Sequence, residues 1–152
     1  MTAEELQLGL RRLRLATLLQ FALPGVPCIY YGDEAGLEGY KDPFNRATYP
    51  WGREDADLLD WYRRLGAARR GCDALVDGDF EPLSARRETV AFVRRSAQGA
   101  LLCAVNRSHT EQTIPLPPSF AEARPIAGEC RVEEGRLILA PLSGVWLSSE
   151  AN

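Results

Sequence analysis

The residues with the greatest capacity for chemistry lie just after an apolar run at residues 26–31. Asp33 and Glu34 are adjacent carboxylates, and Asp42 follows nine residues after Asp33 without a second acid at a defined spacing. If the run is a strand whose geometry persists, adjacent side chains point to opposite faces of it. Asp33 and Glu34 then cannot flank a single bond, so this chain offers no catalytic carboxylate pair of its own.

Cysteine and histidine usage argues against a metal site. Cys28, Cys72, Cys103 and Cys130 are widely scattered, no C-x-x-C pair occurs, and His109 is the only histidine. This spacing lacks the clustered ligands of a zinc site. Two disulfides are formally possible, but four thiols in a cytosolic protein are the simpler account. We expect no metal and no cofactor.

The first part of the chain predicts a helix, a buried strand and a second helix. Residues 26–31 form a short apolar run between turn signals, which is typical of a strand buried on both faces. Helical patterns occupy residues 4–22 and 57–70 on either side, and Thr2 with Glu5 fits a capping box at the first helix start. Helix, strand and helix make one unit of a parallel α/β fold, and one unit is too few for a sheet.

A long aromatic loop follows the predicted strand. Residues 37–52 far exceed the usual two to six residues of such connections. Their aromatic residues argue against disorder, and loops at the C-terminal ends of parallel strands are where ligands bind. We expect Tyr40 and Trp51 to pack within the loop, and Asp55 or Asp57 to cap the next helix.

From about residue 71 onward the pattern changes to short strands. Apolar runs recur with Gly, Asn and Ser turns between them, at residues 75–80, 89–93, 100–105, 112–114, 130–132, 136–139 and 145–147. Such spacing without a helical period predicts an antiparallel β-sandwich. We place the domains at residues 1–72 and 73–152.

Composition excludes several classes of partner. The formal charge is −3, and no basic stripe is interleaved with aromatic residues, so we expect no nucleic-acid partner. The longest strongly apolar stretch, residues 15–22, is far shorter than the ~20 residues that span a bilayer, so we expect no membrane partner. No basic n-region of a secretory signal is visible, and we expect a cytoplasmic location.

The motifs of the first part resemble a known enzyme family. The run LPGVPCIYYGDEAG at residues 23–36 is followed by Asp42-Pro43-x-x-Arg46 and by Tyr49-Pro50-Trp51. These motifs resemble the alpha-amylase family of glycoside hydrolases, and most of all its neopullulanase, cyclomaltodextrinase and maltogenic amylase branch. The resemblance covers the whole chain. It implies the last α-β-α unit of a (β/α)8 TIM barrel followed by a C-terminal antiparallel β-sandwich. Ala47 departs from many relatives, which have a second arginine there.

The resemblance implies an enzyme that acts on α-glucans by the retaining route. That route needs a carboxylate nucleophile and a carboxylic acid about 5 Å apart. In this family these groups and a third carboxylate follow barrel strands four, five and seven, and all of them would precede Met1. We therefore expect this chain alone to be inactive.

The resemblance also assigns a substrate-binding role to Asp42 and Arg46. In the neopullulanase-like branch these two positions lie beside the non-reducing end of the glucan. A carboxylate that accepts from sugar hydroxyls and a guanidinium that donates to them would hold one glucose ring. The alternative is structural: Asp42 caps the turn at Pro43, and Arg46 pairs with it or with Glu38.

The implied barrel is incomplete in this chain. A barrel strand pairs with neighbours on both sides, and residues 26–31 have neither neighbour here. We therefore expect a C-terminal fragment from a truncated reading frame, with an α-glucan oligosaccharide as ligand of the complete enzyme and the missing N-terminal part or another chain as a possible partner. Two alternatives stay open: a non-catalytic carbohydrate-binding or partner-stabilising module, and a small β protein whose helical half serves assembly.

Overall fold

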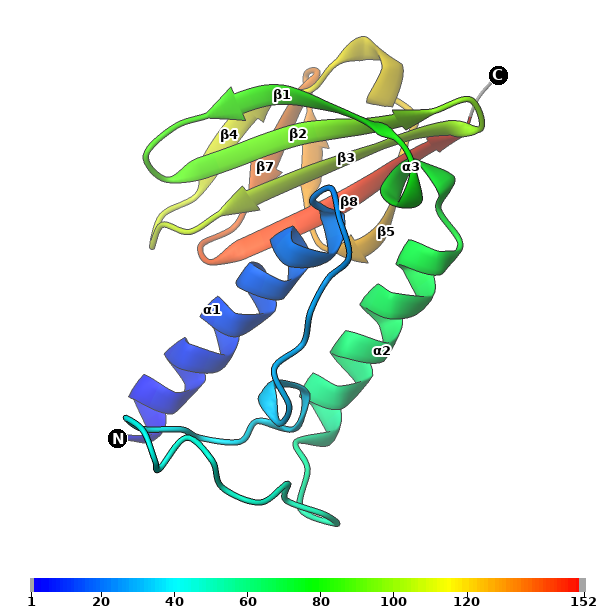
Figure 1. Ribbon diagram of the computed structural model, residues 1–152. Coiled ribbons are helices and arrows are strands. Elements are labelled where there is room, and N and C mark those ends of the chain that lie inside the picture. The colour runs from blue at the N-terminus through cyan, green and yellow to red at the C-terminus, as the bar shows by residue number, and fades with distance from the viewer. Residues whose placement is uncertain (1, 151–152) are drawn as a thin grey trace.

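The computed structural model describes residues 2–150, in which a layer of helices packs on one face of a five-stranded antiparallel sheet and a three-stranded antiparallel sheet packs on its other face (Figure 1). The elements follow in the order α1 Ala3–Ala22, η1 Asp33–Ala35, α2 Ala56–Arg70, α3 Asp73–Val76, β1 Asp79–Ala85, β2 Thr89–Ser96, β3 Gly99–Asn106, β4 Gln112–Pro115, η2 Pro118–Phe120, β5 Arg124–Gly128, β6 Arg131–Glu133, β7 Arg136–Leu139 and β8 Ser143–Glu150. Within residues 2–150, no helix is both long and apolar enough to cross a membrane.

Both long helices begin at the predicted caps. Thr2 and Glu5 form the capping box of α1: the Glu5 backbone N–H donates to Thr2 Oγ1 (3.1 Å), and the Thr2 N–H donates to Glu5 Oε2 (2.7 Å). Asp55 caps α2 by accepting from the Leu58 N–H (2.9 Å). These bonds satisfy amide groups that have no partner inside a helix. The predicted helices are confirmed.

The predicted buried strand at residues 26–31 is wrong for this structure. The segment runs between α1 and α2 without entering either sheet (Figure 1). Val26 is 93% exposed, and Ile29, Tyr30 and Tyr31 are exposed too. Strand geometry depends on hydrogen-bonded neighbours, and the described part of the chain provides none here.

The antiparallel strands of the second part are confirmed. One sheet has the order β1-β2-β3-β8-β5, and the other has the order β4-β7-β6. Two details differ from prediction: residues 75 and 76 belong to α3, and β5 was not anticipated. The β6–β7 hairpin turns at Glu134 and Gly135, whose φ angles are positive, at 49° and 69°. That backbone is typical of tight hairpins.

Strand β3 lies in the middle of the molecule and is buried on both faces. Leu101, Cys103 and Val105 pack against the helices, whereas Leu102 and Ala104 pack against the smaller sheet. This alternation has the period of two expected for a strand. Its continuous apolar run therefore reflects a layer on each side.

Side chains from α2, β2 and β8 donate hydrogen bonds to carbonyl groups near the end of α1. Trp146 Nε1 donates to the Leu18 oxygen (3.1 Å), Arg69 Nη1 to the Phe21 oxygen (2.6 Å) and Arg94 Nη1 to the Ala22 oxygen (2.9 Å). The last carbonyls of a helix lack partners inside it and carry partial negative charge. Sheet and helices are therefore joined by directed hydrogen bonds as well as by apolar packing.

Candidate functional site

The candidate site is the loop that follows η1, at the end of the helices farthest from the sheets (Figure 1). The loop leaves η1 at Gly36 and returns beside it, because the Asp55 N–H donates to the Ala35 carbonyl (3.0 Å). Tyr31 joins its middle to the preceding segment through a hydrogen bond from its hydroxyl to the Ala47 carbonyl (2.9 Å). The long predicted loop is thus closed at its base and fixed at one point along its length.

Asp33 and Glu34 lie at the base of this loop and make local contacts. Glu34 Oε2 accepts from the Gly32 N–H (3.0 Å), and Gly32 has a φ of 93°, where glycine is favoured. Partial burial raises the pKa of Asp33, and the charge of Glu34 raises it further. Through the bond to Gly32, Glu34 fixes the backbone at the start of η1.

The raised pKa of Asp33 predicts a pH-dependent stability. The folded chain binds this proton more tightly than the unfolded chain, whose reference pKa is 3.8. Stability from this group therefore increases as the pH falls from neutral through the folded pKa toward that reference value. Asp33→Asn should raise the urea midpoint at pH 7 and flatten its rise toward pH 4. Asp79→Asn, at an exposed position of β1, is the control, and an unchanged pH profile in D33N would contradict the assignment.

The structure brings Asp42 and Arg46 together. Arg46 Nε lies 2.7 Å from Asp42 Oδ1, with side chains 70% and 61% exposed. This is the pairing that the structural alternative predicted. An exposed pair of this kind contributes only ~0–1 kcal/mol, so a ligand with hydroxyl groups could replace it at little cost. The sugar-binding role of these residues stays a prediction.

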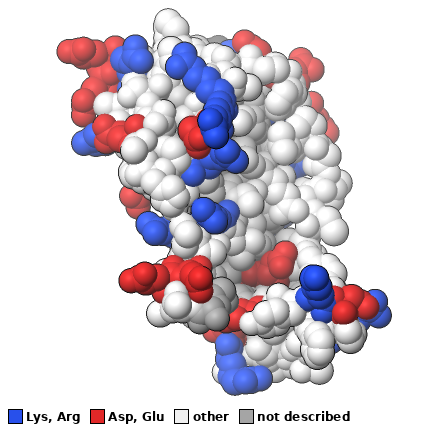
Figure 2. All heavy atoms as spheres, turned by 90° about the vertical axis from the view of Figure 1, so that its left-hand side faces the viewer, with Lys and Arg blue, Asp and Glu red and all other residues white. Residues whose placement is uncertain are grey.

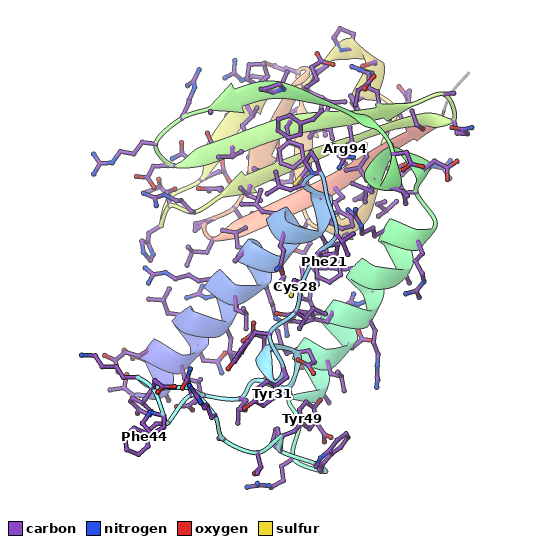
Figure 3. All side chains as sticks on the ribbon, in the orientation of Figure 1. Phe21, Cys28, Tyr31, Phe44, Tyr49 and Arg94 are labelled. Atoms are coloured by element: carbon purple, nitrogen blue, oxygen red, sulfur yellow. The ribbon has the colours of Figure 1, made fainter. Side chains whose placement is uncertain are left out.

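The same loop carries aromatic side chains that face solvent. Tyr40 is 71% exposed and Trp51 is 80% exposed, so most of the surface of both rings faces solvent and loop packing covers only a small part of it. Trp51 contacts only the Tyr49 ring among the other aromatic rings described, with centroids 4.6 Å apart. Figure 3 shows Phe44, Tyr31 and Tyr49 at this end of the molecule, with Phe44 on the side of α1 and Tyr49 on the side of α2. Exposed rings can stack on apolar faces of a ligand. Trp61 and Tyr62, by contrast, are buried in the core.

The described residues do not include a metal cluster. Nowhere in residues 2–150 do three or more His, Cys, Asp or Glu side chains lie close enough to hold an ion. The four cysteines are free thiols, of which Cys28 is exposed and Cys103 is buried. The loop thus provides polar and aromatic groups that suit binding.

Comparison with known proteins identifies relatives among glucan-cleaving enzymes. The chain is 40% identical over 121 residues to an amylopullulanase from Thermoanaerobacterium saccharolyticum, a match that covers 72% of this chain and 10% of that protein. It is 36% identical over 108 residues to a cyclomaltodextrinase from a Bacillus species, covering 68% and 19% respectively. The chain thus spans only a tenth to a fifth of the length of these relatives. No family model matches it.

The fold leads to the same group of proteins. The structure superposes on the debranching enzyme from Nostoc punctiforme with a TM-score of 0.78 and 29% identity, covering 90% of this chain and 30% of that one. A cyclomaltodextrinase structure gives a TM-score of 0.75 at 28% identity, covering 91% and 26%. The chain therefore belongs to the alpha-amylase family of glycoside hydrolases, and it corresponds to the C-terminal portion of these enzymes.

Proposed function

We propose that this chain is the C-terminal part of a retaining α-glucan hydrolase. In the complete enzyme, residues 1–72 would supply the last α-β-α unit of a (β/α)8 barrel, and residues 73–152 would form the C-terminal β-sandwich domain. One observation carries the proposal: residues 26–31 are apolar, mostly exposed and outside both sheets, although two well-formed helices flank them. A closed barrel would give this segment a strand on each side.

The catalytic groups of that enzyme would come from outside this chain. Retaining hydrolysis needs two carboxyl groups about 5 Å apart across the scissile bond. At the candidate site, the Glu34 carboxylate accepts from a backbone amide and the Asp42 carboxylate is paired with Arg46. Neither arrangement resembles an acid and a nucleophile that face each other. The chain alone is therefore inactive in this proposal.

The loop would contribute to binding of the glucan. Asp42 and Arg46 would exchange their mutual ion pair for hydrogen bonds to the hydroxyls of one glucose ring. Structural neighbours support an oligosaccharide ligand: the Nostoc punctiforme debranching enzyme was soaked with acarbose, and a hydrolase from Arthrobacter globiformis was solved with cyclic maltosyl-maltose. The partner of this chain would be the N-terminal part of the barrel or a chain that supplies it.

Activity assays test directly whether this chain alone is inactive. The purified chain should release no sugar from pullulan, starch or cyclodextrin above background, because it lacks the carboxylate pair. Turnover by this chain would refute the assignment. The sequence upstream of the Met1 codon gives an independent check, since it should encode the earlier acids of the barrel.

A maltotriose titration separates the proposal from its alternative. A non-catalytic carbohydrate-binding module would bind maltotriose saturably without the rest of a barrel, whereas we expect no saturation with this chain. If binding does occur, the double variant Asp42→Ala/Arg46→Ala shows whether this pair is responsible. Asp60→Ala/Arg64→Ala removes a second exposed ion pair of the same type and spacing, at 2.8 Å on α2, and is the matched control.

The proposal places the protein in the cytoplasm. Four free thiols suit a reducing compartment. Cell fractionation with an antibody to the chain tests this location, and recovery from a secreted fraction would overturn it.

A further inference from the structure

A groove between α1 and the first sheet is separate from the candidate site. Its volume is about 690 Å³, within the range of about 300–1,000 Å³ typical of ligand sites. The floor is mostly apolar and comes from α1, β2 and β3: Leu15, Ala16, Leu19, Thr89, Val90 and Val105. Neither the proposed hydrolysis nor the glucan loop uses this surface.

The rim of the groove is strongly basic. Arg12 lies on the α1 side, and Arg86, Arg87 and Arg107 lie on the side of the sheet, together with His109. Glu88 is the only acidic residue in the lining. With His109 neutral, four guanidinium groups and one carboxylate give this rim a charge of +3, although the whole chain carries −3. Figure 2 shows basic side chains gathered on the face of the molecule that contains α1.

Hydrogen bonds hold one side of the rim in place. The Arg86 N–H donates to the Thr89 carbonyl (2.8 Å) and closes the β1–β2 turn. Arg107, after β3, donates its backbone N–H to the Glu88 carbonyl (2.9 Å) and its Nε to the Arg87 carbonyl (3.0 Å). The two turns are therefore joined, so the backbone on this side of the rim is fixed before a ligand binds.

Glu88 neutralises only part of this charge. Its carboxylate lies 3.6 Å from Arg87 Nε and 3.5 Å from Arg107 Nε. In the part of the chain that the structure describes, Arg12 and Arg86 make no ion pair. The groove thus presents at least two guanidinium groups without an acidic partner, one on each side of an apolar floor.

We propose that this groove binds an acidic amphipathic helix of another polypeptide. Leucine-like side chains of the helix would enter the floor between Leu15 and Val105, and flanking carboxylates would pair with Arg12 and Arg86. An apolar groove that accepts one face of a helix is a recurring mode of recognition, and the basic rim selects for acidic flanks. A small free anion would satisfy the rim but leave the apolar floor in water.

A pair of synthetic peptides tests this inference on the full chain. Both carry the same leucine stripe at helical spacing, and one has glutamate flanks where the other has lysine flanks. Binding of the labelled glutamate peptide should raise its fluorescence anisotropy. The lysine peptide should bind at least about tenfold more weakly, because its charges repel the rim. Raising the salt concentration to about 0.5 M should weaken binding of the glutamate peptide, since salt screens exposed charges.

Charge reversal locates the binding. Arg12→Glu/Arg86→Glu should lower the affinity for the glutamate peptide about tenfold or more. Arg124→Glu/Arg136→Glu, at exposed positions outside the groove, should change this affinity by less than about twofold. Circular dichroism shows whether each variant is folded. Equal binding of both peptides, no binding of the glutamate peptide, or displacement of it by inorganic phosphate at matched ionic strength would each overturn the proposal.

Discussion

Replacing Arg94 with leucine is expected to destabilise the chain by about 2–4 kcal/mol. Arg94 is only 2% exposed and has no carboxylate partner among the described residues. Its guanidinium donates to the Ala22 carbonyl from Nη1 (2.9 Å) and to the Gly78 carbonyl from Nη2 (2.8 Å) and Nε (3.2 Å). Leucine would leave the buried Ala22 oxygen and the partly buried Gly78 oxygen without this donor.

Two opposing effects decide the size of this loss. Burial lowers the pKa of Arg94, and the nearby charge of Arg69 lowers it further, so the buried cation itself carries a cost. The end of α1 offsets this cost, because the carbonyls there are the negative pole of the helix. A hydrophobic replacement relieves the desolvation but orphans two acceptors, and the orphaned acceptors dominate.

The neighbouring arginine provides a matched control. Arg95 is partly exposed and pairs with Glu81 at 2.9 Å on the surface of β1 and β2. Arg95→Leu should therefore change the free energy of unfolding by less than about 1 kcal/mol. Urea-induced unfolding of both variants measures the difference, and equal losses at the two positions would contradict the role assigned to Arg94. Arg94→Lys should fall between them, because one ammonium group cannot span both carbonyls.

Two apolar runs show what the sequence could and could not predict. Residues 26–31 and residues 100–105 are both apolar runs that predict strands, but only the second run is a strand, as the core of β3. The difference lies in their neighbours: β3 pairs with β2 and with β8, and layers cover both of its faces. The apolar pattern of a segment indicates that it needs neighbouring strands and a layer on each face. It does not show whether the chain contains them.

Burial of polar residues was less predictable than the strands. Arg94 continues the alternation of Phe92 on the side of β2 that faces the helices, but arginine is rarely found fully buried. Its partners, Ala22 and Gly78, are distant in sequence, so no local signal marks the contact. Within the candidate site, the spacing of Asp42 and Arg46 was enough to anticipate their pairing, whereas the exposure of Tyr40 and Trp51 depends on how the loop is folded.

The Asn106-Arg107-Ser108 motif is a further case in which the sequence alone does not reveal that a polar residue is buried. It matches a glycosylation sequon, yet Asn106 is fully buried and its amide group is occupied. Nδ2 donates to the carbonyls of Thr110 (2.8 Å), Leu139 (3.2 Å) and Ala140 (2.8 Å), and Oδ1 accepts from the Ser108 N–H (2.9 Å) and Oγ (2.8 Å). This one side chain joins the β3–β4 turn to the end of β7.

Asn106→Asp should therefore destabilise the chain by about 3 kcal/mol or more at pH 7. The change is nearly isosteric, but it places a carboxylate oxygen against three carbonyl oxygens and removes both donors. Burial should raise the pKa of the new carboxyl group, so part of the loss should be recovered as the pH falls and the protonated acid regains one donor. Urea unfolding at pH 7 and pH 5 measures both effects. Gln98→Glu, the same amide-to-acid change at an exposed turn between β2 and β3, should alter stability by no more than about 0.5 kcal/mol. If N106D unfolds at the same urea concentration as the parent chain, Asn106 does not hold this turn.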